Sequence, residues 1–530
     1  MSPKLPSPRE YNGRGAFGSD SKSGPSVTDT ERRKARMTHS SEAEAARRAP
    51  LGLWDVVSII IGIVVGAGIY ETPPIVYRNV SGPWEAMGVW LLGGVVSFVG
   101  ALCLAELAAA YPRSGGDYVY LTRAFGSWLG FLFAWFQLAI VRAANIAMMA
   151  FVFADYSASI WSIPEGRRWL WACAAVLLLT LLNLLGVVFG RRTQNVLTIA
   201  KVVGLSGVVL VGFLAGFEAS TTVHSPPTAS TPSLATAMVL VLLTYGGWND
   251  AAFVAAEVRG GSRAVVRSLL LGTAAVMLIY LLLNAAFLWG MGFETARSSD
   301  AIAADLLKVR LGPWGGRAIS VLVVLSALGA INGMMFSGSR VYAALGGDHA
   351  VFAWLGRMRS RTRSPWVALT IQSSVSLVSI GAIGTPNGRA WINESLHILG
   401  LSKVEWMGHG GFEVLSVLTT PLFWLFFLFC GLSLFVLRQL DPSLERPFRV
   451  PFYPELPLLF CGICAYMVYA GIEFAHSFSF FPSLALLSGA LLAAGLLLFR
   501  ISRWMTRRTI GEVPRAGAFR SNPNLTPKHP

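Results

Sequence analysis

The sequence predicts an all-α polytopic membrane protein of about twelve spans, arranged as two five-helix halves with two additional helices. Three observations predict this fold. The chain is 54% hydrophobic and only 13% charged, whereas soluble domains average about 25% charged residues. Apolar stretches of about 20 residues, the length that crosses a bilayer, recur along the chain. Two of these stretches are also interrupted at mid-depth by glycine-rich, polar segments.

The predicted spans follow one another between residues 51 and 500. They cover 51–77, 86–110, 126–154, 169–189, 195–217, 234–257, 265–291, 316–345, 365–384, 412–437, 453–475 and 481–500. The third and eighth are longer than one crossing requires, so we expect them to tilt or to extend past the surface. The loop at about 385–411 is longer and more polar than the others.

The regions outside the spans are predicted to be tails. Residues 1–50 are rich in Ser, Arg, Glu and Pro and contain no apolar run. They cannot bury enough surface to fold, and they lack the apolar core of a signal peptide. Residues 501–530 are predicted to form a second cytoplasmic tail.

The net charge of +15 raises the possibility of a nucleic-acid partner, but the positions of the charges indicate a membrane topology. Arginines gather in the loops that would share one side with the N-terminus, whereas the short loop 218–233 on the other side has no basic residue. This is the positive-inside bias, although Arg78, Arg167 and Arg168 fall outside it. We expect both termini to be cytoplasmic and no nucleic-acid partner.

Two spans are broken in their middles. The first break is Gly66-Ala67-Gly68-Ile69-Tyr70, and the second is Tyr245-Gly246-Gly247-Trp248-Asn249-Asp250. Glycine costs about 1 kcal/mol against alanine inside a helix, and freed backbone groups find no water in hydrocarbon. Such breaks persist where the open backbone lines a cavity. A pair of them in corresponding positions predicts the substrate site of a secondary transporter.

An opened helix offers N–H groups at the start of one half and carbonyls at the end of the other. These ends are partially positive and partially negative, so they suit the carboxylate and the ammonium of an α-amino acid. We expect the carboxylate at the backbone of Gly66, Ala67 and Gly68. The ammonium is assigned to the carbonyls of Val64, Leu243, Thr244 and Gly246. Close helix packing through small residues is the alternative explanation of the glycines.

The two breaks also define the expected topology. Spans one to five (about 51–217) and six to ten (about 234–437) form two halves that each begin with a broken helix. An odd number of spans per half inverts the second half relative to the first, as in the leucine-transporter fold. The additional helices occupy about 453–500.

Further motifs resemble the amino acid–polyamine–organocation superfamily, and in particular its L-type amino acid transporter branch. They are Gly100–Leu107 leading into Tyr111-Pro112-Arg113-Ser114-Gly115-Gly116-Asp117-Tyr118-Val119-Tyr120, Ile140-Val141-Arg142 with Phe153-Ala154-Asp155-Tyr156, Tyr245–Asn249, and Arg446-Pro447-Phe448-Arg449-Val450-Pro451. The first break is similar to the family's Gly-Ser-Gly-Ile-Phe. The resemblance implies the same backbone positions for the substrate.

The resemblance also implies a role for Lys201. It places this lysine where sodium-coupled relatives of the fold hold a sodium ion beside the first broken helix. Sodium coupling is therefore not expected, which leaves exchange, facilitated passage or proton coupling. An intramembrane ammonium is costly unless it is paired or solvated. The alternative is that Lys201 extends to the cytoplasmic surface.

Asp250 and Leu243 depart from the L-type pattern, which has aromatic residues at both places. Asn249 and Asp250 in the second break are also assigned to the substrate site. Asp250 could select a cationic side chain, carry a proton, or pair with a base such as Arg142. The expected substrates are neutral amino acids, with cationic amino acids or polyamines as the alternative.

Other polar residues in or near the spans are candidates for gating or structural roles. By resemblance, Glu106 and Glu257 belong to an inner gate network with Arg113. Arg142 is a mid-membrane charge, so we expect a buried partner in a structural ion pair. Asn332 could face the cavity or form a hydrogen bond between helices.

Other classes of function fit the sequence less well. The seven histidines all lie in loops, tails or span ends, and the five cysteines lie in predicted spans as packed apolar side chains. We therefore expect no metal ion, no cofactor and no enzyme. A sensor that keeps the site without transport remains an alternative.

By resemblance, a cysteine in loop 155–168 would form a disulfide bond with a glycoprotein heavy chain. None is present, so we expect no disulfide-linked partner and a bacterial inner membrane.

Overall fold

The computed structural model describes residues 49–216, 233–359, 361–398, 400, 403–404, 406, 411–476 and 481–511. These residues are helical, and within them no β-strand is found, only two isolated bridges. The expected loop 218–233 and most of both tails lie outside the described residues. The longer helices are α2 (Leu53–Val64), α3 (Gly68–Arg78), α4 (Pro83–Ala110), α5 (Asp117–Phe125), α6 (Ser127–Phe136), α7 (Arg142–Trp161), α8 (Arg168–Leu184), α9 (Val187–Ala215), α10 (Leu234–Thr244), α12 (Gly261–Met291), α14 (Ile302–Leu311), α15 (Trp314–Asp348), α16 (Trp366–Gly384), α17 (Pro386–Ile398), α18 (Gly411–Leu440), α19 (Glu455–His476) and α20 (Phe481–Gly511). Short helices are η1 (Gln137–Val141), η2 (Glu165–Arg167), α11 (Asp250–Phe253), η3 (Ala255–Glu257), α13 (Phe293–Ser298) and η4 (Ala350–Gly356).

The described part of the chain contains ten helices long and apolar enough to cross a membrane. The pair α2 and α3 forms one further span, bent by 52° at its break. The sixth predicted span is divided between the short apolar helix α10, an unwound turn, α11 and η3. The molecule is thus an all-α multi-pass membrane protein, and both predicted helix breaks are confirmed, at 65–67 and 245–249.

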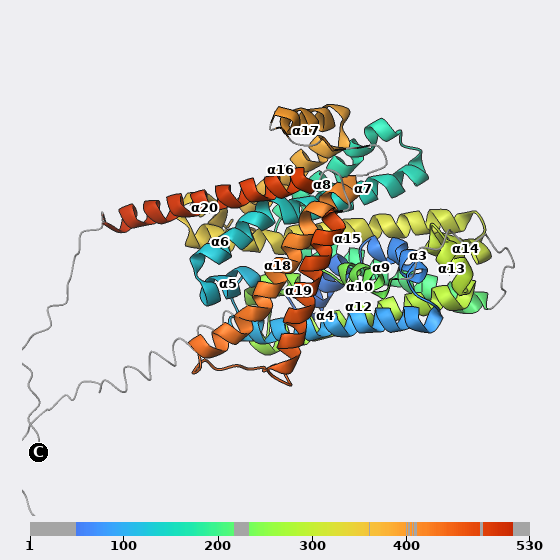
Figure 1. Cartoon of the computed structure of the whole chain (residues 1–530), viewed down its shortest axis with the longest axis horizontal. Helices are drawn as coiled ribbons and strands as arrows, with labels where there is room; N and C mark the ends of the chain where they lie inside the picture. The colour runs from blue at the N-terminus through green and yellow to red at the C-terminus, as the bar shows by residue number, and fades with distance from the viewer. Residues whose placement is uncertain are drawn as a thin grey trace, which may run out of the picture. The chain divides into compact units, whose positions relative to one another are not determined.

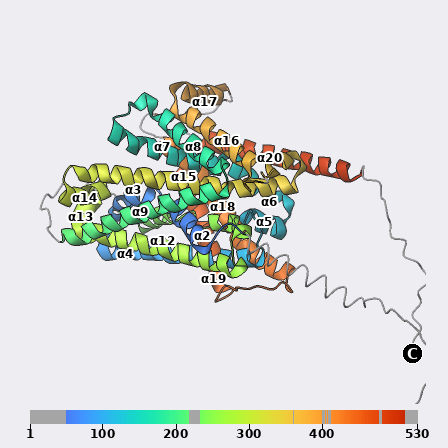
Figure 2. The same cartoon turned by 180° about the vertical axis from the view of Figure 1, so that it is seen from behind.

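The spans pack side by side, with α15 between α9 and α7 (Figure 1). Both views place α13 and α14 at one end of the bundle and α5 with the end of α20 at the other (Figure 2). The two broken helices lie inside: α2 packs on α9, α12 and α15, and α10 packs on α3 and α4. The breaks are therefore enclosed by other helices rather than by lipid, as open backbone in a membrane requires.

The observed helices differ most from the predicted ones in three regions. The fourth span was expected to end at 189 and the fifth to begin at 195, but α8 ends at Leu184 and α9 begins at Val187, after Gly186 at φ 130°. Arg191 thus lies in a helix, where it pairs with Asp55. The polar loop at 385–411 contains α17, and α20 continues to Gly511 through the start of the expected tail. In each case a charged or polar stretch was interpreted as a loop although helices carry such residues readily at their ends.

A short π-helix interrupts the third span. η1 occupies Gln137–Val141, between α6 and α7, and Arg142 follows it directly. Such single-turn bulges are rare and often occur at functional sites. This π-helix was not predicted, because its residues carry no glycine or proline that would mark an irregular turn.

Candidate functional site

The two helix breaks lie against each other. A Cβ atom added to Gly68, the first residue of α3, would stand 3.2 Å from Thr244 Cγ2 at the end of α10. A Cβ atom added to Gly247 would stand 2.8 Å from Ile63 Cγ2 in α2, and Gly247 has φ +109°. The positive φ of Gly247 favours glycine there, and at both positions the side chain of the other broken helix leaves little room for a Cβ atom.

A tyrosine from a third helix joins the two breaks. The hydroxyl of Tyr280 in α12 lies 2.8 Å from the carbonyl oxygen of Val64 and 3.2 Å from that of Thr244. Tyr280 is fully buried, and its ring packs against Trp90 and Tyr245 at centroid distances of 5.7 and 4.9 Å. This aromatic cluster holds the ends of α2 and α10 at one level.

The N–H end of the site is the start of α3. The first N–H groups of a helix have no partner within that helix, and at this start they belong to Gly68 and the residues after it, with Ala67 as the N-cap. The N–H of Gly66 instead donates to the carbonyl of Val64 at 2.8 Å. The start of α3 is therefore the part of the first break best able to bind an anion.

The carbonyl end of the site is partly engaged within the protein. The carbonyl of Val64 accepts from both Tyr280 and Gly66, and that of Leu243 accepts from Gly246 N–H at 3.1 Å. A carbonyl oxygen has two lone pairs, so Leu243 and Thr244 keep one acceptor position each. An ammonium group would have to displace a hydrogen bond at Val64.

Lys201 lies beneath the first break. Its side chain is fully buried, and Nζ donates to the carbonyls of Gly62 at 2.8 Å and Val65 at 2.5 Å. A Cβ atom on Gly329 of α15 would stand 3.4 Å from this Nζ, so a glycine also leaves room for the lysine. The side chain does not extend to the surface; it places a cation at the carbonyl end of α2, where the helix dipole is negative.

Asp250 is paired with Arg142. Arg142 Nη1 and Nη2 donate to the two carboxylate oxygens of Asp250 at 2.5 and 3.0 Å, and Ser337 Oγ donates to Oδ2 at 2.6 Å. Both charged side chains are at most 6% exposed. A Cβ atom on Gly338 would meet Arg142 Nε at 3.2 Å, so α15 is open enough to admit the guanidinium. This bidentate geometry is the strong form of a charged hydrogen bond.

Two asparagines of the sequence analysis form contacts between helices. Asn332 donates to the carbonyl of Gly190 at 3.1 Å and to Gln194 Oε1 at 2.7 Å, and it accepts from Asn183 Nδ2. Asn249 donates to Asp117 Oδ2 at 3.0 Å. Of the two roles considered for Asn332, the structure has the hydrogen bond between helices.

The expected network of Glu106, Glu257 and Arg113 is not what the structure contains. Glu106 accepts two hydrogen bonds from Arg438, one from Arg446 and one from the N–H of Val450. Glu257 pairs with Arg340 at 3.0 Å. Arg113 instead lies 3.8 Å from Asp348 at the end of α15. The side chain of Arg113 is 70% exposed, and the described contacts of Glu106 and Glu257 are with other arginines.

A further ion pair closes the same end of the bundle. Asp441, directly after α18, accepts from Arg123 at 2.6 Å and from the hydroxyl of Tyr111 at 2.6 Å. These hydrogen bonds lower the pKa of the Asp441 carboxyl to about 2. The carboxyl is therefore ionised throughout the physiological range and ties α5 to α18.

The start of α2 is also fastened at this end. The N–H of Leu51 donates to the carbonyl of Glu257 at 3.1 Å, and the N–H of Arg259 donates to the carbonyl of Leu51 at 2.7 Å. The segment before the first broken helix is thus paired with the segment that follows the second.

At the opposite end of the bundle, a hollow of about 370 Å³ lies beside α3, α7, α14 and α15 and is lined in part by Tyr70, Tyr156 and Arg317.

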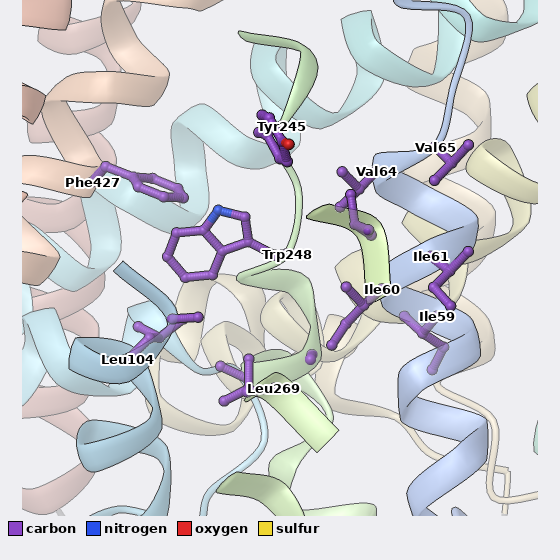
Figure 3. Packing of buried hydrophobic residues seen from close by; sticks show 14 of the residues in the cluster. Ile59, Ile60, Ile61, Val64, Val65, Leu104, Tyr245, Trp248, Leu269 and Phe427 are labelled. Carbon is purple, nitrogen blue, oxygen red and sulfur yellow. The ribbon is translucent and has the colours of Figure 1, made fainter. Parts of the chain in front are cut away.

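Several residues of the site were missed by the sequence analysis. They are Tyr280, Ser337 and Asp117, all buried and all in contact with a break or with the residues next to it. Asp117 was seen only as part of a motif, although a carboxylate among apolar residues is a signal in itself. Figure 3 shows Trp248 projecting from the second break toward Phe427 and Leu104, away from Val64. No sequence pattern indicated that Trp248 of the second break would pack toward Phe427 and Leu104.

The chain is similar to known amino acid transporters over most of its length. A family model described as "Amino acid permease" matches residues 51–508. The chain is 26% identical over 415 residues to the serine/threonine exchanger SteT of Bacillus subtilis, covering 77% of this chain and 88% of that protein. It is 27% identical to the mouse b(0,+)-type amino acid transporter 1, covering 83% and 86%, and 30% identical to the mouse Asc-type amino acid transporter 1, covering 68% and 71%.

Proposed function

Since this chain belongs to the amino acid permease family, we propose that it carries amino acids across a membrane by alternating access around its two helix breaks. The observation that carries this proposal is the contact of the two breaks, Gly68 against Thr244 and Gly247 against Ile63. Relatives whose names describe transporters and an exchanger cover most of the chain. Repeat one is then about 51–217, repeat two about 234–437, and the additional helices follow.

In this proposal the substrate is held by backbone groups. Its carboxylate binds the N–H groups of Ala67 and Gly68, and also that of Gly66 once its bond to Val64 is released. Its ammonium binds the carbonyls of Leu243, Thr244 and Gly246, and that of Val64 on release of Tyr280. The unpartnered N–H groups at the start of α3 and the free acceptor positions at the end of α10 support this assignment. Binding then requires the two breaks to part slightly, since in this conformation they are in contact.

The proposed substrates are neutral amino acids. A carboxylate that selects a cationic side chain needs an acceptor position directed to the cavity. Asp250 instead uses both oxygens for Arg142, and one of them also for Ser337. Separating this pair to admit a second cation would leave a buried charge unmatched, which costs several kcal/mol. The pairing therefore favours neutral over cationic substrates.

Transport is proposed to be independent of sodium. The ammonium of Lys201 already occupies the carbonyl end of α2, bonded to Gly62 and Val65, so a second cation there would be repelled. Exchange or proton-coupled uptake then remain as modes of transport.

The inner end is closed by the Leu51, Glu257 and Arg340 contacts, which we propose open during the cycle. Glu106 and Arg113 would brace the helices around that gate.

The arginine bias of one side supports an orientation with both termini cytoplasmic. We propose a bacterial inner membrane, because loop 155–168 has no cysteine for a glycoprotein partner. The absence of a cysteine from loop 155–168 also supports function without a disulfide-linked partner. Membership of a permease family supports transport rather than catalysis. A sensor with the same site is the competing function of another class.

Uptake of labelled amino acids into proteoliposomes tests the proposal. We expect uptake of neutral amino acids that is equal in sodium and in choline medium. Stimulation by a preloaded amino acid would identify an exchanger, and stimulation by an imposed proton gradient would identify a symporter. Absence of uptake for every amino acid, with measurable binding of one of them, would reject transport in favour of the sensor.

Substitution of Lys201 by alanine should reduce uptake at least tenfold. The change removes two charged hydrogen bonds to the end of α2, each worth about 1.5–3 kcal/mol, and so loosens the first break. Initial rates in proteoliposomes measure the effect, with Lys308→Ala as the control because Lys308 is a half-exposed surface lysine. An unchanged rate in Lys201→Ala would contradict the assigned role.

A further inference from the structure

The loop between α4 and α5 fixes a buried carboxylate against the second break. Gly115 and Gly116 have φ +109° and +47°, and a Cβ atom on Gly116 would stand 2.6 Å from Phe253 Cδ1. The N–H of Gly115 donates to the carbonyl of Phe253 at 3.0 Å. These two glycines let the loop lie directly on α11, and the next residue, Asp117, then points into the protein.

Asp117 has fewer partners than a buried carboxylate requires. It is 2% exposed, and its Oδ2 accepts from Asn249 Nδ2. Its Oδ1 and the Oδ1 of Asn249 are both buried without a hydrogen-bond partner. Among the described residues, no ion pair to Asp117 is found, although nearly all buried charges are paired. The thiol of Cys430, a weak donor, lies beside the Asp117 carboxyl. Within the described part of the chain, no nitrogen or hydroxyl donor reaches either of the two unpartnered oxygens.

Charges on the surrounding helices do not compensate this carboxylate. Arg142 of α7 is neutralised by Asp250 of α11, and Asp348 of α15 and Asp441 after α18 are each paired with an arginine near other parts of α5. The remaining titratable neighbours are Tyr120 of α5, Tyr342 of α15, Cys103 of α4 and Cys430 of α18. None of these carries a positive charge.

We propose that Asp117 binds a proton, and that this proton couples the α4–α5 loop to the second broken helix. A proton on Oδ1 gives the side chain a donor for Asn249 Oδ1, while Oδ2 still accepts from Nδ2. The two side chains then form a cyclic acid–amide pair in which both orphan acceptors are satisfied. Loss of the proton leaves an unpaired charge beside the break and weakens the attachment of Asn249.

The environment of Asp117 sets the pH at which this occurs. Burial raises the pKa of the Asp117 carboxyl to about 7, and the hydrogen bond from Asn249 offsets only part of that increase. A raised folded-state pKa means that the protonated, docked form is favoured as pH falls below about 7 and is lost as pH rises through it. A cavity of about 10 Å³ lined by Asp117, Asn249 and Trp248 is close to the smallest that holds one water.

The inference rests on the proposed transport function, so the test has one readout with transport and one without. Purified wild type and Asp117→Asn are compared in proteoliposomes between about pH 5.5 and about pH 8.5, a range that brackets the carboxyl's titration. Asparagine reproduces the donor and acceptor of the protonated acid. We therefore expect the wild-type rate to change several-fold across this range, and Asp117→Asn to keep the low-pH rate throughout. Asp300→Asn is the matched control, since that carboxylate is 97% exposed.

Infrared difference spectra of the same proteins give the readout that needs no transport. Wild type and Asp300→Asn should show a protonated carboxyl band that disappears as pH rises through about 7, and Asp117→Asn should lack it. A band that persists in Asp117→Asn, or a pH–rate profile unchanged by this substitution, would overturn the proton site. If wild type transports no amino acid but shows the band, the proposed function fails while the proton site stands.

Discussion

Gly68→Val should abolish substrate binding in a protein that still folds. The expected loss of affinity is at least a hundredfold, about 2.7 kcal/mol. A Cβ atom at this position already stands 3.2 Å from Thr244 Cγ2, and valine adds two methyl groups to it. The start of α3 must then move away from the end of α10, which separates the groups proposed for the carboxylate and the ammonium.

Folding should survive because Gly68 begins a helix with ordinary helical geometry. The matched control is Gly207→Val in α9, where an added Cβ meets no atom within 4 Å. Both variants place the same side chain in a helix, and valine is a slightly better helix former than glycine. Equilibrium binding of labelled amino acids to purified protein measures the difference, and size-exclusion profiles verify folding. Wild-type affinity in Gly68→Val would show that the substrate lies elsewhere.

The sequence predicted the fold and the helix breaks because their signals are local. Hydrophobicity over about 20 residues marks a span, and glycines at mid-span mark a break. The predicted first break, 66–70, overlaps the observed 65–67, and the second, 245–250, nearly coincides with the observed 245–249. The family motifs added the order of the halves. None of these signals needs knowledge of which residues meet in space.

The partners of the charged residues could not be predicted in the same way. Glu106 binds Arg438 and Arg446, which follow it by more than 300 positions, and Tyr280 reaches Val64 across 216 positions. One chain contains many arginines, and only the packing of the spans decides which of them meets a given carboxylate. Arg113 was assigned to the network of Glu106 by family resemblance, because the sequence does not show how the spans pack.

Breaking the Arg142–Asp250 pair should cost more stability than any surface substitution. Arg142→Met leaves a carboxylate buried at 4% exposure with Ser337 as its remaining donor, and removal of one partner of a buried pair costs about 3–5 kcal/mol. Asp250→Asn should be milder, because the amide oxygen still accepts from Arg142. The double variant Arg142→Met/Asp250→Leu should recover part of the loss, since no charge is left unpaired.

Thermal unfolding in detergent, followed by size-exclusion chromatography, measures these effects, with Asp300→Asn as the exposed control. The same variants address selectivity. If Asp250 serves only Arg142, uptake of neutral amino acids by Asp250→Asn should keep its order of preference, and lysine should remain a poor competitor. Full stability of Arg142→Met, together with a changed response to lysine in Asp250→Asn, would mean that Asp250 faces the substrate. Neutral substrates would then no longer be favoured, because that preference requires the protein to hold both oxygens of Asp250.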